Sequence, residues 1–267
     1  MIDYSINMKN LRKYGKSPFN VAVIHGGPGA PGEMAPVARE LFSGWGVLEP
    51  FQTASSLEGQ VKELNEVLET SGVPPITLIG WSWGAILSFI FTARCPSMVK
   101  KLILVGSGPF EKKYAAEIMK TRVSRLNEKE KTEILAIIEN LNNAAIKDKN
   151  TLMSRLGRLM FKSDSYNSLS YKSEILEYQY HIFRSVWEDA EKLRADGELL
   201  ELGKQIQCPV VVIHGNYDPH PGEGVRKPLS RVLKDFRFIL LEKCGHYPWF
   251  EREAMDSFYD IIKKELH

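Results

Sequence analysis

Three residues that could together perform nucleophilic catalysis occur in the order Ser82, Asp218 and His246. Ser82 is the central residue of the segment GWSWG (80–84), which fits the pattern G-x-S-x-G. An apolar run, ITLIG, ends in the motif and another, AILSFIF, follows it, as expected for a strand, a tight turn and a helix. Both glycines are needed because side chains two residues either side of the serine would collide in such a turn. We therefore expect Ser82 to be a nucleophile whose following amide lies at a helix N-terminus, where an anion is favoured.

The acid and the base each follow an apolar run that is typical of a buried strand. Asp218 lies in VVVIHGNYDPHP and His246 in FILLEKCGHYPWFE. Both should fall at the carboxyl edge of a parallel sheet, where ligands usually bind. Asp218 would orient the imidazole of His246, which would take the proton of Ser82. Asp235 and Asp256 fit the acid's role less well, since one precedes a strand pattern and the other lies in a helical one.

A second motif, HGGPG (25–29), follows the first buried strand pattern and could supply part of an oxyanion hole. Such a site needs two backbone N–H groups directed at the developing negative charge. Trp83, which follows the nucleophile, would provide one. Pro28 has no N–H, so Gly27 is the expected second donor.

This chemistry requires no cofactor, and the sequence predicts no metal site. His220 flanks the acid and is expected near the mouth of the site, but no histidine has a partner at the sequence spacing of metal ligands. Three cysteines are widely spaced without a C-x-x-C pair, which predicts reduced thiols: Cys95, Cys208 and Cys244.

The composition of the 267-residue chain is that of an ordinary globular protein, with 43% hydrophobic and 25% charged residues. A net charge of +2 argues against nucleic acid or an anionic membrane as partner, so the expected partner is a small-molecule or short peptide substrate. The first ten residues have no apolar core of a signal peptide, and no long uncharged apolar stretch follows. These features predict a cytoplasmic protein, and they leave its oligomeric state open.

Strand and helix patterns alternate along most of the chain. Apolar, β-branched runs predict strands at 20–25, 46–49, 76–80, 99–105, 210–214 and 237–241. Helical spacing predicts helices at 31–42, 57–70, 85–94 and 251–266. Parallel neighbours need crossover connections, which are usually helical, so the alternation predicts an α/β fold with a mostly parallel, doubly wound sheet.

The alternation is interrupted once, over residues 110–205, where no strand pattern occurs. Apolar residues such as Ile134, Leu141, Ile182 and Val186 instead recur at helical spacing. We expect a helical cap at 110–205, inserted between two strands of a core formed by residues 1–109 and 206–267.

The two motifs and the order of the three residues resemble the α/β-hydrolase superfamily over nearly the whole chain. HGGPG together with SWG resembles prolyl iminopeptidase and its relatives more closely than it does esterases at large. In that family the cap supplies acidic residues that hold the free amino terminus of the substrate. Glu174, Glu177 and Glu188 lie in the corresponding region. Trp81 stands where that family usually has glycine, and the opening antiparallel strands look shortened or absent.

The resemblance implies a serine hydrolase acting on an ester or amide bond of a small substrate through an acyl-enzyme. The alternatives are a prolyl iminopeptidase, another hydrolase such as a lactonase, a thioesterase or a carbon–carbon bond hydrolase, and a ligand receptor or scaffold on the same fold. Aromatic residues near the motifs could line an apolar acyl pocket or pack in the core. The candidate substrate contacts are Trp81, Glu174, Glu177 and Trp249.

Overall fold

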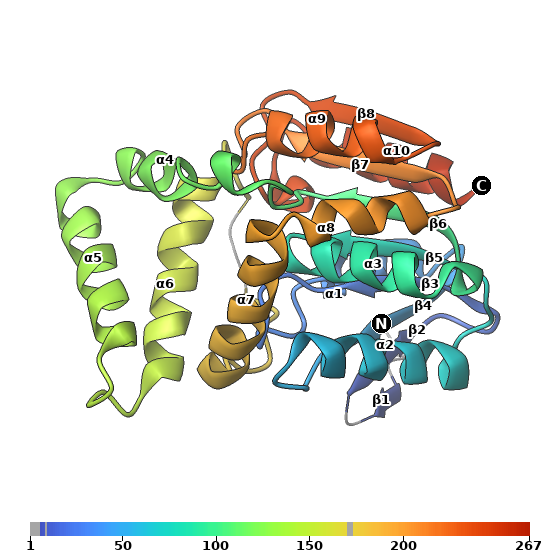
Figure 1. The fold of residues 1–267 in the computed structure, drawn as a ribbon, viewed down its shortest axis with the longest axis horizontal. Coiled ribbons are helices and arrows are strands. Elements are labelled where there is room, and N and C mark those ends of the chain that lie inside the picture. The colour runs from blue at the N-terminus through green and yellow to red at the C-terminus, as the bar shows by residue number, and fades with distance from the viewer. Residues whose placement is uncertain (1–5, 9, 170–172) are drawn as a thin grey trace.

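The computed structural model describes residues 6–8, 10–169 and 173–267 and contains one eight-stranded sheet of order β1-β2-β4-β3-β5-β6-β7-β8 (Figure 1). The strands are β1 (Ile6–Met8), β2 (Leu11–Tyr14), β3 (Phe19–Ile24), β4 (Gly46–Pro50), β5 (Ile76–Trp81), β6 (Val99–Val105), β7 (Val210–Gly215) and β8 (Phe236–Leu241). All neighbours from β4 to β8 are parallel. The predicted α/β fold with a mostly parallel sheet is confirmed.

The opening antiparallel strands are present, although they are short. β1 pairs with β2, and β2 pairs with β4, with Tyr14 opposite Val47. The sequence suggests that these strands are shortened or absent, because three or four residues are too few for a strand pattern to be recognised.

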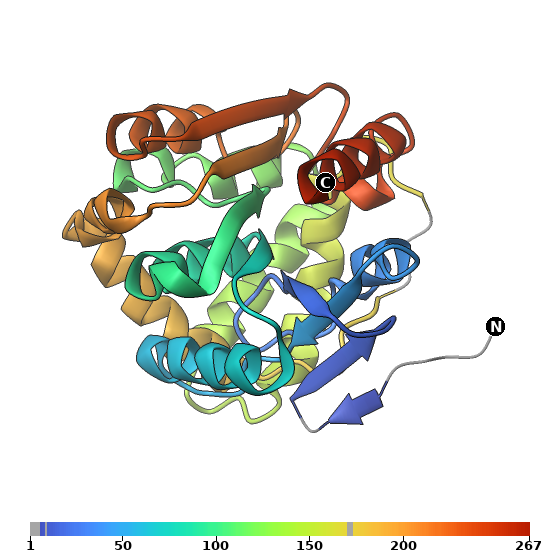
Figure 2. The same ribbon diagram turned by 90° about the vertical axis from the view of Figure 1, so that its right-hand side faces the viewer.

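Helices cover both faces of the sheet, which Figure 2 shows nearly edge-on. One hydrophobic cluster packs α2 (Leu57–Ser71), α3 (Trp83–Arg94) and α9 (Glu223–Val232) on the first face, and another packs α1 (Ala35–Leu41) and α10 (Met255–Leu266) on the second. Successive residues of β5 alternate between the clusters, with Leu78 in the first and Ile79 in the second. The central strands are therefore buried on both sides, which explains their continuous apolar runs.

Helix α9 was not predicted, and its Pro228 explains why, since proline inside a pattern usually ends a helix. Proline cannot donate to the carbonyl of Gly224, four residues earlier. In the structure that carbonyl accepts from the backbone N–H of Phe110 at 3.1 Å. A partner from another segment thus replaces the hydrogen bond that proline removes.

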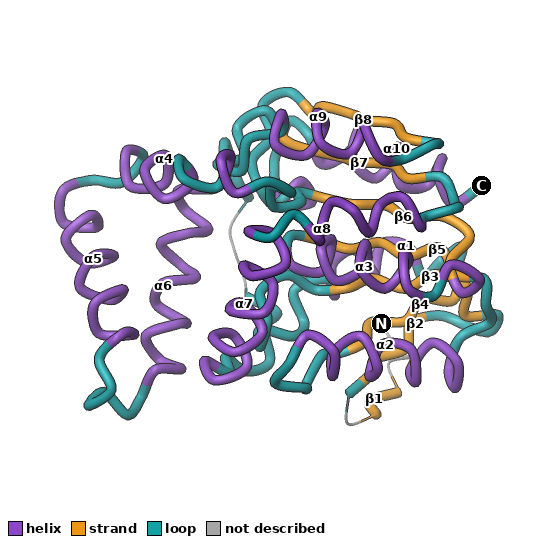
Figure 3. The backbone as a smooth tube through the Cα atoms, in the orientation of Figure 1, coloured by secondary structure: helices purple, strands orange, loops and turns teal. Residues whose placement is uncertain are grey.

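Between β6 and β7 the described residues form helices and loops (Figure 3). The helices are α4 (Ile118–Ser124), α5 (Glu128–Asn142), α6 (Lys149–Asp164), α7 (Tyr180–Ala195) and α8 (Glu198–Glu201). Helices α4 to α6 extend away from the sheet in Figure 1 and share a small hydrophobic cluster that includes Ile134, Ile137 and Leu156. Helix α7 packs on the main core through Ile182 and Val186. The chain reaches these helices from the carboxyl end of β6, the edge at which the predicted site residues should lie.

Among the helices of the described residues, none is long and apolar enough to cross a membrane.

Candidate active site

Ser82 occupies a strained turn between β5 and α3. Its φ of 54° and ψ of −115° lie in a region that non-glycine residues rarely adopt, and its amide donates to the carbonyl of Val105 at 3.0 Å. A Cβ on Gly80 would come within 2.2 Å of the carbonyl oxygen of Gly84, and one on Gly84 within 2.3 Å of that of Ile24. Both glycines of the motif are therefore required by backbone contacts within and beside the turn.

The structure brings Ser82 together with the other two residues predicted from the sequence. His246 Nδ1 lies 2.7 Å from Asp218 Oδ2, and His246 Nε2 lies 3.0 Å from Ser82 Oγ. Asp218 follows β7 and His246 follows β8, so both reach the site from the carboxyl edge of the sheet. Asp218 and His246 are buried, whereas Ser82 is partly accessible.

The ionised carboxylate of Asp218 determines which imidazole nitrogen carries the proton. A carboxylate can only accept, so His246 Nδ1 is the donor to Oδ2. In the neutral imidazole Nε2 is then an acceptor, directed at the hydroxyl of Ser82. The arrangement can take up the serine proton at Nε2.

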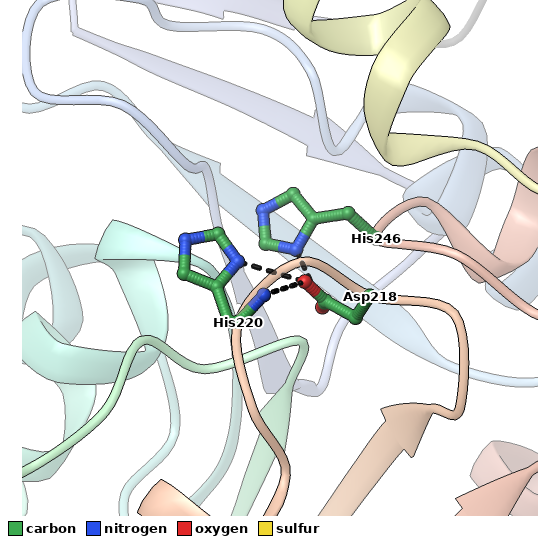
Figure 4. Close-up of side chains that lie close together, drawn as sticks. All are labelled: Asp218, His220 and His246. Carbon is green, nitrogen blue, oxygen red and sulfur yellow. Dashed lines mark hydrogen bonds and ion pairs between the residues drawn. The ribbon is translucent and has the colours of Figure 1, made fainter. Parts of the chain in front are cut away.

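His220 is a second histidine bound to the carboxylate of Asp218, whereas its position in the sequence indicated only a place near the mouth of the site. Its backbone N–H donates to Asp218 Oδ1 at 2.9 Å, and its Nδ1 lies 2.8 Å from the same oxygen (Figure 4). The rings of His220 and His246 are 4.5 Å apart. The proximity of His220 to Asp218 along the chain was a signal for this contact, but the rotamer that directs Nδ1 to Oδ1 was not predictable.

The electrostatics keep this acid ionised and His220 neutral. Burial raises the pKa of Asp218, but His246, His220 and His214 act against it, and the pKa is held well below its usual value. Burial lowers the pKa of His220 to about 4, although Asp218 opposes that shift. At neutral pH the site therefore contains one carboxylate and an uncharged His220.

Asp218, His220 and His246 also offer three potential metal ligand atoms within 4.8 Å of one another. The sequence predicted no such cluster, because only folding brings His246 to the other two. Both oxygens of Asp218 already accept hydrogen bonds from imidazole nitrogens. In the observed contacts Asp218 accepts hydrogen bonds from His220 and His246 and orients their imidazole rings.

The loop containing HGGPG lies directly against the nucleophile turn. A Cβ on Gly26 would come within 2.4 Å of the Trp81 ring and 3.1 Å of Ser82 Cβ. Gly27 has a φ of 56°, a conformation that glycine adopts without strain. Trp83 is the first residue of α3, where backbone N–H groups have no partner within the helix. The two predicted amide donors thus belong to adjoining segments beside Ser82.

A cavity of about 200 Å³ opens at the nucleophile. Its lining combines apolar side chains such as Ile86, Met119 and Trp187 with the charged groups of Arg122, Glu191 and Arg194; Ser82, Trp83 and His220 also contribute.

The four side chains predicted to contact substrate lie elsewhere. Trp81 and Trp249 are each 2% exposed and pack against each other in the core, with ring centroids 5.1 Å apart. Glu174 pairs with Arg39 at 2.6 Å, and Glu177 is exposed. None of the four is among the described residues that line the cavity, so the structure lends no support to their predicted contacts with substrate.

The sequence of this chain is similar to those of known proteins. A family model described as the alpha/beta hydrolase fold matches residues 20–253. A 2-hydroxy-6-oxononadienedioate/2-hydroxy-6-oxononatrienedioate hydrolase from Escherichia coli O81 is 21% identical over 263 residues, which cover 93% of this chain and 87% of that protein. A protein of the same name from Paraburkholderia phymatum is 23% identical over 220 residues, covering 82% of this chain and 72% of that protein.

Solved structures show the same fold at low sequence identity. VinJ is 18% identical with a TM-score of 0.66, and the match covers 98% of this chain and 97% of that one. The 2-hydroxy-6-oxo-6-phenylhexa-2,4-dienoate hydrolase from Rhodococcus sp. strain RHA1 is 15% identical with a TM-score of 0.64, covering 96% of this chain and 93% of that one.

Proposed function

Since the chain belongs to the α/β-hydrolase fold family, we propose that it is a serine hydrolase that cleaves an ester or amide bond of a small substrate. The observation that carries this proposal is the continuous line of hydrogen bonds from Asp218 through His246 to Ser82, at 2.7 and 3.0 Å. The strained backbone of Ser82 supports it, because such strain is concentrated at functional sites.

In the proposed first step, Ser82 Oγ attacks the acyl carbon while His246 Nε2 takes the hydroxyl proton. Asp218 stabilises the resulting imidazolium through Nδ1. The amides of Trp83 and Gly27 bind the oxyanion of the tetrahedral intermediate. The imidazolium then gives its proton to the leaving alcohol or amine, and the acyl group remains on Ser82.

In the second step, water attacks the acyl-enzyme with His246 as the base. The proton taken from water returns to Ser82 Oγ, and the acid product leaves. Every proton moves through His246 Nε2, so neither step requires a second general acid or base.

The size of the cavity supports a small substrate. Its volume of about 200 Å³ is below the range of roughly 300–1,000 Å³ that is usual for pockets of drug-sized ligands.

The curated relatives favour a second candidate function. Their name describes a substrate with a ketone and two carboxylates but no ester or amide, so its hydrolysis breaks a carbon–carbon bond. This chain would then add water across a bond beside a ketone, the hydroxyl group ending on the acyl fragment and the hydrogen on the other.

The prolyl iminopeptidase alternative has weaker support. A free amino terminus requires a carboxylate close to the reacting carbon, but Glu174 pairs with Arg39 and Glu177 is exposed. Glu191 is the one glutamate among the described residues that line the cavity, and it shares it with Arg122 and Arg194. Because Asp164 pairs with Arg122, the charges of Glu191 and Arg194 remain and offset each other, which leaves no excess negative charge for a cationic amine.

The test combines active-site labelling with a substrate panel. A serine-directed fluorophosphonate should add one label to the protein, detected by intact mass, and Ser82→Ala should prevent it and lower turnover by about 10⁴-fold or more. Ser107→Ala, which removes a buried hydroxyl from a neighbouring loop, should label normally.

Four substrates separate the candidate functions: a short-chain nitrophenyl ester, a proline anilide, its N-acetylated form and a 2-hydroxy-6-oxodienoate. Turnover of the ester supports the main proposal, and turnover of the dienoate alone supports the second. A requirement for the free amine of the anilide would instead establish the aminopeptidase. Undiminished labelling of Ser82→Ala would show that the nucleophile is another residue.

A further inference from the structure

Arg194, in the last turn of α7, is a buried cation beside the candidate active site. Its residue exposure is 8%, and its Nε donates to the carbonyl of Pro109 at 2.8 Å. Its Nη2 lies 3.9 Å from the position that a Cβ on Gly108 would take. Gly108, Pro109 and Arg194 all line the cavity that contains Ser82. The guanidinium thus reaches the loop that follows β6, close to the nucleophile.

No carboxylate of the described residues lies within 4.0 Å of the Arg194 guanidinium nitrogens, although such pairs are present elsewhere in the protein. Arg122, the other arginine of the cavity, is fully engaged by Asp164 through contacts of 2.7, 2.9 and 3.1 Å. Glu191 raises the pKa of Arg194 from a greater distance, and one of its oxygens accepts from the indole of Trp187. Within the described part of the chain, the charge of Arg194 therefore has no direct counter-ion.

Burying a cation without a paired anion is costly, and the protein retains one here. Burial lowers the pKa of Arg194 from its usual value, with Glu191 opposing the shift, as expected for a charge that has lost water without gaining a full partner. The ring of Trp187 lies 5.8 Å from the guanidinium carbon and helps to hold it in place.

We propose that Arg194 is the subsite for a carboxylate carried by the substrate, so that the enzyme prefers short acyl groups with a terminal carboxylate. With Nε bonded to Pro109, the two Nη groups are left to form the parallel hydrogen bonds that suit a carboxylate. The inference rests on the proposed function for the identity of the reacting group, but the anion site itself does not require it.

The surface next to the cavity is consistent with an anionic ligand. A hollow of about 450 Å³ shares Ala115, Glu191 and Arg194 with the cavity and is also lined by Lys112 and Lys192. Three cations and one carboxylate thus surround this hollow among the described residues, and such a balance favours the approach of a negative ligand.

A competing explanation is that Arg194 only clamps the loop at Pro109. Substitution would then affect every substrate equally, whereas a carboxylate subsite predicts a selective loss. The experiment compares mono-4-nitrophenyl succinate with 4-nitrophenyl butyrate, two esters of similar size that differ in the terminal carboxylate. Arg184→Gln is the matched control, because Arg184 is on the same helix, exposed, and paired with Glu188 outside the cavity.

The wild type should hydrolyse the succinyl ester with the higher kcat/KM, and Arg194→Gln should lower that value by about 10- to 100-fold, the range expected for hydrogen bonds to a charged group. The butyrate ester should change by less than about threefold, and Arg184→Gln should behave as wild type. An equal loss on both esters, or no preference in the wild type, would overturn the proposal.

A binding measurement separates this proposal from the proposed reaction. In the Ser82→Ala variant, succinate should alter the fluorescence of Trp83 and Trp187, which line the cavity, and adding Arg194→Gln should abolish the change. Succinate binding without cleavage of any ester would reject the reaction and retain the subsite. Ester cleavage without succinate binding would reject the subsite alone.

Discussion

The indole N–H of Trp81 donates a 2.8 Å hydrogen bond to the backbone carbonyl of His246, 165 residues away in the sequence. The two rings also lie 5.1 Å apart. Trp81 is the last residue of β5, immediately before the nucleophile, and is 2% exposed. Trp81 therefore links the turn that carries Ser82 to the loop that carries His246. It acts as a positioning residue for His246.

Replacing Trp81 by Phe should lower kcat with little change in KM. The substitution leaves the buried carbonyl of His246 without its donor, a loss of about 1–3 kcal/mol that releases the histidine loop. The measurement is steady-state kinetics with the nitrophenyl ester that proves to be the best substrate.

Trp249→Phe is the matched control, because the buried Nε1 of Trp249 has no hydrogen-bond partner in the described structure. It removes an indole from the same aromatic cluster without breaking such a bond, so its kcat should be closer to that of the wild type. A rise in KM with unchanged kcat for Trp81→Phe would instead indicate that Trp81 contacts substrate.

Replacing Asp218 by Asn should reduce kcat by about 10⁴-fold while the fold is retained. An amide can place its oxygen toward only one of the two imidazole nitrogens that the carboxylate now serves, so either His246 or His220 loses its acceptor. Kinetics should be combined with thermal unfolding of both variants. Asp235→Asn, at an exposed carboxylate before β8, is the control, and an equal loss of activity there would contradict the assignment of the acid.

Gly106→Ala should impair catalysis beyond its effect on stability. Gly106 has a φ of 50°, and an added Cβ would lie 3.1 Å from His246 Nδ1 and 3.3 Å from Asp218 Oδ2. The methyl group would therefore press on the hydrogen bond between these residues, and we expect kcat to fall at least about tenfold, a loss of roughly 1.4 kcal/mol in transition-state stabilisation.

Gly197→Ala separates crowding from backbone strain. Gly197 has a φ of 80°, but nothing lies within 4 Å of an added Cβ. Both variants should lose about 1–2 kcal/mol of stability from the left-handed backbone, measured by urea unfolding. The activity of Gly197→Ala should remain that of the wild type, and similar kinetics for the two variants would show that crowding at Gly106 has no catalytic effect.

The neutral state of buried His220 should make the protein less stable in acid. Its pKa is lowered from 6.5 to about 4 in the folded protein, mainly by burial. Between these values the unfolded chain binds a proton that the folded protein does not, so stability falls as the pH decreases from 6.5 to 4. Below the folded pKa, both states carry the proton and this loss stops increasing.

Urea unfolding at pH 7.5 and 4.5 should therefore show a smaller acid loss for His220→Gln than for the wild type, by about 2–3 kcal/mol. His181→Gln, at an exposed histidine, should retain the pH dependence of the wild type. An acid loss unchanged by His220→Gln would show that His220 does not carry this linkage.

Much of the fold and of the candidate site could be predicted because the relevant signals are local. At the turn of Ser82, Gly80 is required for a steric reason that acts within five residues, because a Cβ there would meet the carbonyl of Gly84. Strand β6 has the same bounds in the pattern and in the structure, because its last four residues, LILV, are apolar and buried. The parallel arrangement then places the ends of β5, β7 and β8 at one edge, where Ser82, Asp218 and His246 meet.

Other features depended on contacts between distant segments. Helix α9 tolerates Pro228 because Phe110 supplies the missing donor, and nothing near the proline indicates this. Trp81 adjoins the nucleophile in sequence, yet the alternation of side chains along β5 directs it into the core rather than the cavity.

The sequence by itself thus determined the nucleophile turn, the mostly parallel sheet and the order of the three reactive residues. Only the tertiary structure decided which partner each side chain meets: two histidines on Asp218, the indole of Trp81 on the carbonyl of His246 and, among the described residues, no carboxylate paired with Arg194. The physical reason is one of range. Backbone sterics and the burial of apolar runs act between close neighbours in the chain, whereas hydrogen bonds and charge pairs form through space, between residues that only folding brings together.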